Sequence, residues 1–186
     1  KQKIFNAILS TQITEGLAFY TSFACSFFFG YKGKMEGNAK IIGLIARDEN
    51  LHAAITQNII KYWRENKDEG FQQVVKDNEQ KIYDMYGLAA ENEKKWGEYL
   101  FSQGSLLGLN SEMLSGYIEW LANTRLRSLG YDKIFDQPTN PIGGWLNSFT
   151  DSSKVQVAPQ ETEISSYKIG ARDTEINEEE FEDFDL

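Results

Sequence analysis

The chain has 186 residues, of which 41% are hydrophobic and 13% aromatic, enough for one domain with a sizeable core. Its single cysteine, Cys25, excludes an intrachain disulfide, and no apolar run approaches the roughly 20 residues that cross a bilayer. The net charge of −9 lies mostly between Glu161 and Leu186, which carry −8, so the remaining body is nearly neutral and nothing in it predicts a nucleic-acid surface. We expect a cytoplasmic protein that does not enter a membrane.

Four segments have helical periodicity, and none has the alternation of a convincing strand. The first is expected to run from Lys1 to Phe29, before Gly30 and Gly33. The second, from Glu36 to about Arg64, is the most regular of the four. These two segments carry the residues of greatest chemical interest.

A third helix is expected from Glu69 to about Lys95, with inward-facing Phe71, Val74 or Val75, Ile82 and Tyr86. A fourth is expected from Ser111, as N-cap, to Leu129, where Gly130 ends it. The stretch 97–108 is compatible with helix or loop, and 136–145 has the composition of a loop. The fold class is therefore all-α, with a helical body over 1–153 and an acidic tail over 154–186 that is expected to be disordered when free.

The second helical segment has an anomaly at its centre. Its apolar stripe consists of residues spaced 3, 4, 3, 4 and 3 apart, namely Ile42, Ile45, Glu49, His52, Thr56 and Ile59. A carboxylate in such a stripe is costly unless a base, hydrogen bonds or a metal compensates its charge. Glu49 and His52 at i and i+3 can reach one point beside the helix, and this donor pair suits iron or manganese. A solvated glutamate beside a surface histidine is the alternative.

Glu15 repeats this anomaly in the first helical segment, between Thr11 and Phe19 on the expected inner face. Ferritin-like di-iron proteins use a Glu from each of two helices and a Glu-x-x-His from each of two others. Glu15 with Glu49 and His52 matches half of that set. His52 is the only histidine, so this sequence alone cannot supply the second Glu-x-x-His.

The residues around these positions resemble the small subunit of class I ribonucleotide reductase, of the bacterial or phage type with a di-iron tyrosyl radical. The resemblance extends in order over nearly the whole chain, through the segments 15–27, 35–42, 45–52, 117–125, 140–141, 155–161 and 165–167. It implies an incomplete ferritin-like helical bundle, the carboxy-terminal half, and two iron ions as cofactor, with manganese possible on donor chemistry.

The resemblance also implies roles for individual residues. Three of the family's six metal-ligand positions match Glu15, Glu49 and His52, and the apolar pocket around the radical tyrosine matches Phe19, Phe23 and Ile45. Ordinary core packing is an alternative for the two phenylalanines. The same resemblance assigns radical transfer to three residues. Asp48 matches a carboxylate that hydrogen-bonds a ligand histidine, and Glu161 and Tyr167 match two residues of the tail.

The family's amino-terminal half, with its radical tyrosine and remaining ligands, is missing from this sequence. We interpret the start of the chain, which has no initiator Met, as a break inside a longer protein whose other half is a separate polypeptide or was removed. The implied partners are that half, the large subunit bound through 161–186, and a second copy of the assembled subunit. Two other hypotheses are a non-catalytic fragment that only docks on the large subunit, and another di-iron oxidase.

Overall fold

The computed structural model describes residues 1–66 and 70–150. Over these residues the chain forms helices and no strand, in agreement with the all-α prediction; Leu106 and Leu109 form one isolated bridge. The helices are α1 (Gln2–Gly16), α2 (Tyr20–Tyr31), α3 (Glu36–Glu65), α4 (Phe71–Asp77), α5 (Glu79–Leu100), α6 (Ser111–Ser128) and α7 (Gly143–Thr150).

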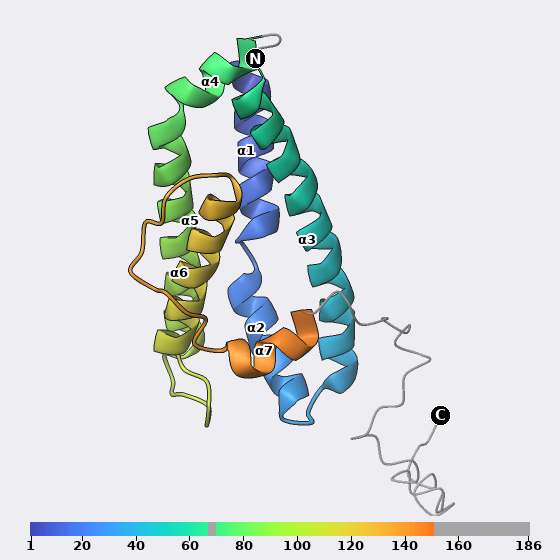
Figure 1. Ribbon diagram of the computed structural model, residues 1–186. Coiled ribbons are helices and arrows are strands. Elements are labelled where there is room, and N and C mark those ends of the chain that lie inside the picture. Colours follow the sequence, from blue (N-terminus) through green and yellow to red (C-terminus); the bar gives the residue numbers. More distant parts are fainter. Residues whose placement is uncertain (67–69, 151–186) are drawn as a thin grey trace, which may run out of the picture.

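The helices form an elongated bundle in which α1 and α2 follow one another through the middle (Figure 1). Helix α3 packs along both of them on one side, and the pair α5 and α6 lies on the other side (Figure 1). Short α4 joins α3 to α5 at one end, and α7 crosses α2 near the opposite end. The core between the layers contains fully buried side chains from α1, α2, α3, α5 and α6, among them Phe5, Leu9, Phe27, Ile60, Ile82, Tyr86, Ile118 and Leu126.

The prediction of one helix from Lys1 to Phe29 is wrong, because the helix is interrupted at residues 17–19. Phe19 has φ 77° and ψ −15°, a left-handed conformation that costs a non-glycine residue about 1–2 kcal/mol. Gly30, expected to end the helix, lies inside α2. A Cβ at Gly30 would come within 2.6 Å of the Ala39 Cβ, so glycine is needed there for the close approach of α2 and α3.

The third predicted helix is divided at Asn78, whose Nδ2 donates hydrogen bonds to Val74 O and Gln2 Oε1. Its expected inner face is confirmed, because Phe71, Val75, Ile82 and Tyr86 are buried. Helix α5 continues to Leu100, which resolves the first part of the ambiguous stretch as helix.

Two further boundaries differ from the prediction. The N-cap of α6 is Asn110 and not Ser111, since Asn110 Oδ1 accepts a hydrogen bond from Met113 N at 2.8 Å. Helix α7 was not predicted, because its pair of leading glycines, Gly143 and Gly144, has the composition of a turn. The expected tail, 154–186, lies outside the described residues.

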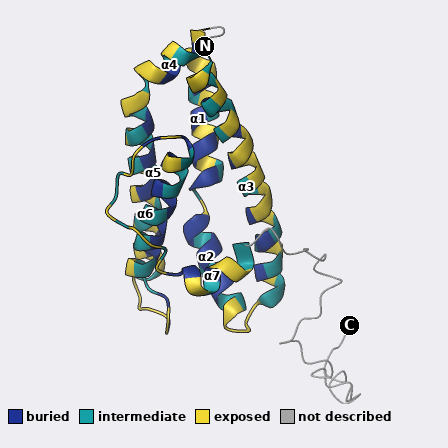
Figure 2. Ribbon diagram, viewed as in Figure 1, coloured by how far each residue is buried: buried dark blue, intermediate teal, exposed yellow. Residues whose placement is uncertain are grey.

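The buried face of α3 lies beside the predicted stripe and not on it. Of the six stripe residues only Thr56 is buried, whereas the interface with α1 and α2 is made largely of small residues, Ala39, Gly43, Ala46 and Ala53. Among the described residues, Ile45 is 40% exposed and the His52 side chain 51% exposed. Figure 2 shows the exposed length of α3 that results.

Candidate metal centre

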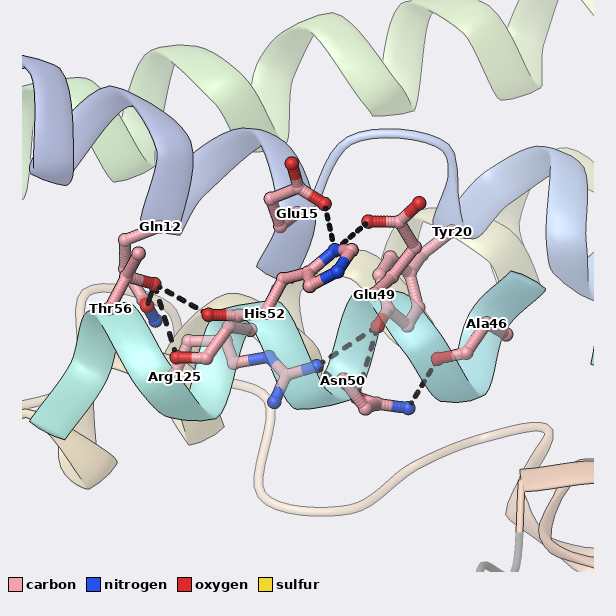
Figure 3. Close-up of polar contacts among 10 residues, drawn as sticks. Gln12, Glu15, Tyr20, Ala46, Glu49, Asn50, His52, Thr56 and Arg125 are labelled. Carbon is pink, nitrogen blue, oxygen red and sulfur yellow. Dashed lines mark hydrogen bonds and ion pairs between the residues drawn. The ribbon is translucent and has the colours of Figure 1, made fainter. Parts of the chain in front are cut away.

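Glu15, Glu49 and His52 meet at the boundary between α1 and α3 (Figure 3). Glu15 occupies the last turn of α1, and the other two lie one turn apart on α3. His52 Nδ1 is 3.1 Å from Glu15 Oε2 and 3.5 Å from Glu49 Oε2. One ligand atom from each residue lies within 4.8 Å of the others, so a single cation can contact all three side chains. The predicted ligand group is thus brought together.

The donor set fits a hard or borderline divalent metal. Two carboxylates and one imidazole, without a thiolate, suit iron or manganese. Glu49 Oε2 is buried and makes no hydrogen bond with any described residue, although it faces the His52 ring. A buried carboxylate oxygen without a donor is costly, and coordination of a cation compensates that cost.

A hydrogen-bond network beside the centre includes Arg125 of α6, for which no role was predicted. Its Nε donates to Gly16 O at 2.9 Å, and its Nη2 donates to Asn50 Oδ1 at 2.7 Å (Figure 3). Gly16 and Asn50 directly follow Glu15 and Glu49 in the chain. One guanidinium therefore links the backbone beside one carboxylate to the side chain beside the other.

Tyr20 belongs to the same network, since its hydroxyl donates to Asn50 Oδ1 at 3.0 Å and accepts from Arg125 Nη2 at 3.1 Å. Burial raises the pKa of Tyr20, and the Arg125 guanidinium offsets part of that rise. The phenol therefore remains protonated at neutral pH and can donate this hydrogen bond.

A second buried chain of hydrogen bonds reaches α3 from α1 and α5. The Thr56 hydroxyl donates to Gln12 Oε1 at 2.5 Å, and Gln12 Nε2 donates to Tyr86 OH at 3.4 Å. Burial raises the pKa of Tyr86 to about 12. Sequence reasoning missed Gln12; the available signal was a polar residue between the apolar positions Leu9 and Ile13.

The three residues of the expected apolar pocket differ in exposure. Phe23 is buried, and its ring centroid lies 5.4 Å from that of Tyr20 and 6.3 Å from that of Phe19. Phe19 and Ile45 are 49% and 40% exposed. Only Phe23 of the three is buried among the described residues, and the role of these residues as an apolar pocket stays a prediction.

Asp48 lies exposed on α3 and makes no hydrogen bond or ion pair with any described residue, His52 included. The role of Asp48 in orienting a ligand histidine stays a prediction. Glu161 and Tyr167 lie outside the described residues. In the described part of the chain no helix is long and apolar enough to cross a bilayer.

Comparison with known proteins gives consistent matches. The family model "Ribonucleotide reductase, small chain" matches residues 1–141. The ribonucleoside-diphosphate reductase subunit beta of Buchnera aphidicola subsp. Baizongia pistaciae is 46% identical over 187 aligned residues, covering 100% of this chain and 50% of the relative. Subunit beta of ribonucleoside-diphosphate reductase 1 from Escherichia coli O157:H7 is 42% identical with the same coverage.

Among solved structures, the ribonucleotide reductase R2 subunit from Clostridium botulinum superimposes with a TM-score of 0.68 and 31% identity. The match covers 77% of this chain and 44% of that one, which confirms the expected incomplete ferritin-like bundle. The chain spans about half the length of the relatives that it matches. It belongs to the ribonucleotide reductase small-chain family.

Proposed function

We propose that this chain supplies half of the di-iron site of a ribonucleoside-diphosphate reductase beta subunit, in the cytoplasm. The observation that carries the proposal is the convergence of Glu15, Glu49 and His52 in a member of the small-chain family. When bound, two iron ions would use oxygen to oxidise a tyrosine side chain to a radical. Manganese binds to the same donor atoms. The chain's own contribution is to hold three ligands on two packed helices.

The remaining ligands and the radical tyrosine come from a second polypeptide segment. This chain has one histidine, so the other Glu-x-x-His of a ferritin-like centre cannot be its own. The half-exposed side chains Phe19, Ile45 and His52 adjoin the centre, and a covering segment there would exclude water from it. The complete subunit is proposed to form a homodimer, as the resemblance implies.

The oxidising equivalent is proposed to leave through Asp48 and the tail residues Glu161 and Tyr167. The tail, 161–186, is proposed to dock on the large subunit, where the nucleotide is reduced. Its acidic sequence contains Phe181, Phe184 and Leu186, a pattern suited to an apolar groove with a basic rim. The same feature supports the second candidate, a fragment that only docks. A different di-iron oxidase would not require such a tail.

The test is iron content and electron paramagnetic resonance after ferrous iron and oxygen are added. The full chain is measured alone and with a polypeptide that supplies the amino-terminal half of a small subunit. Two irons per assembly and a tyrosyl radical in the mixture, with no radical and at most one bound ion in the chain alone, support the proposal. Glu49→Gln should abolish the radical, and Glu98→Gln, at an exposed position on α5 with no hydrogen bond or ion pair among the described residues, should not. Absence of iron and of the radical from the wild-type mixture would contradict the proposal and would favour the second candidate, a fragment that only docks on the large subunit.

A further inference from the structure

The interruption between α1 and α2 lies directly beside the metal centre. Only Gly16 to Ala18 separate Glu15, in the last turn of α1, from Phe19, the left-handed residue that precedes α2. A bulky residue in this conformation persists only where its surroundings determine it. The contacts that hold this segment therefore also influence where the Glu15 carboxylate lies.

Glu93 of α5 accepts hydrogen bonds from the backbone at the interruption. Its Oε1 accepts a hydrogen bond from Phe19 N at 3.3 Å, and its Oε2 accepts one from Thr21 N at 3.1 Å. The Thr21 hydroxyl donates to the Glu93 carbonyl at 3.2 Å. These amides belong to the start of a helix, where no earlier turn supplies acceptors. Both carboxylate oxygens of Glu93 are thus used on the strained turn.

Arg125 of α6 contacts the same segment through Gly16 O before the interruption and the Tyr20 hydroxyl after it. Glu93 and Arg125 contact different atoms, and neither is within hydrogen-bonding distance of Glu15, Glu49 or His52. The interruption is consequently held by side chains from both α5 and α6, and Glu15 directly precedes it.

We propose that Glu93 is a positioning residue for the metal centre. By accepting hydrogen bonds from the Phe19 and Thr21 amides, it keeps the turn left-handed and so holds the Glu15 carboxylate near Glu49 and His52. The inference rests on the proposed function in one respect, that these three residues bind a metal. Without these two hydrogen bonds, α1 and α2 are expected to join into one helix. The direction of the Glu15 side chain relative to α3 would then change.

The variant Glu93→Gln is the sharpest substitution because it keeps the size of the side chain. An amide has only one acceptor oxygen, and its NH₂ group cannot accept a hydrogen bond from the second backbone amide. Glu93→Asp retains the charge but is one methylene shorter, so it cannot reach both amides at their present distances. The matched control is Glu98→Gln, an equal loss of charge on the same helix.

The experiment is a titration of the full chain with Co²⁺, whose visible absorption reports coordination geometry. Wild type and Glu98→Gln should bind alike, and Glu15→Gln should lose the absorption. Glu93→Gln should weaken the Co²⁺ affinity about tenfold, at the lower end of the range for residues that orient ligands, and change the band shape at saturation. Glu93→Asp should behave similarly and gives a second reading if Glu93→Gln folds poorly.

A purely structural role for Glu93 would lower the melting temperature but leave the band shape of the folded, saturated protein unchanged. An unchanged affinity and band in both Glu93 variants overturns the inference while the proposed metal site stands. A wild-type chain whose Co²⁺ absorption is absent, or is unaffected by Glu15→Gln, overturns the metal site itself and the inference with it. Circular dichroism of each metal-free variant establishes that the folded state is being compared.

Discussion

Arg125 and Asn50, 75 positions apart in the chain, are joined by a hydrogen bond of 2.7 Å between Nη2 and Oδ1. Among the described residues no carboxylate forms an ion pair with Arg125, so its partly buried charge is compensated by neutral acceptors. Asn50 Nδ2 in turn donates to Ala46 O at 2.9 Å, which fixes the orientation of the amide. This arrangement couples α6 to both ligand-bearing segments.

Replacement of Arg125 by Gln should lower the free energy of unfolding by about 2–4 kcal/mol, because it leaves Gly16 O without a donor and removes one of the two donors to Asn50 Oδ1. The matched control is Arg127→Gln, which removes an exposed charge two residues along the same helix and should change stability by less than about 0.5 kcal/mol. Urea unfolding followed by circular dichroism measures both. Equal losses in the two variants would show that charge alone is responsible.

Gly30→Ala should destabilise the chain by about 1–3 kcal/mol, because the new methyl overlaps the Ala39 methyl where α2 meets α3. Gly43→Ala is the control: its Cβ would lie 3.9 Å from Phe27 Cε1, an ordinary contact, and alanine favours the helix. Thermal unfolding of both variants, and of Gly30→Ala combined with Ala39→Gly, provides the test. The double variant should recover part of the loss; no recovery would place the strain elsewhere.

Asn110→Ala should cost about 1 kcal/mol, because it removes the acceptor for Met113 N at the start of α6. Ser111→Ala, at the N-cap position that the sequence favoured, should have little effect. Chemical denaturation of the two single variants distinguishes the assignments. A larger loss for Ser111→Ala would contradict the cap described here.

Cys25 predicts a dependence of stability on alkaline pH. Burial raises the pKa of its thiol from 9.0 to about 11. With the folded pKa above the unfolded one, the stabilisation is complete below pH 9 and is lost as the pH rises toward 11. Two pKa units correspond to about 2.7 kcal/mol, and partial exposure of the thiol reduces this to about 1 kcal/mol.

The comparison variant is Cys25→Ala, whose unfolding free energy should fall less between pH 9 and pH 11 than that of the wild type. Parallel slopes for the two proteins would show that the thiol does not contribute. Iodoacetamide should react slowly with the native chain at pH 8, because the thiolate is the nucleophile.

The ligand group could be predicted from the sequence because two carboxylates and the only histidine interrupt apolar periodicity at helical spacing. The interruption at Phe19 could not, since neither glycine nor proline occupies residues 17–19 and the apolar pattern runs through them. The Phe19 amide there donates a hydrogen bond to Glu93, 74 positions away in the chain. The face of α3 was misjudged by about one residue because alanine and glycine give a weak apolar signal, yet they permit the close packing. Contacts between residues far apart in the chain produce no periodic pattern in the local sequence, so they could not be predicted from it.

The position of Glu15, Glu49 and His52 at an open edge of the bundle has a consequence for the order of assembly. All three donors belong to one pair of adjacent helices, and the buried contacts between these helices use other residues. Zinc fingers behave in the opposite way, because their metal supplies the folding energy. At the proposed metal site an ion would reach and leave these donors from the solvent side, since nothing among the described residues closes over the half-exposed imidazole. If the proposed centre binds a metal, its retention would depend on whatever covers this edge, and the lifetime of the loaded centre would depend on how long that cover stays in place.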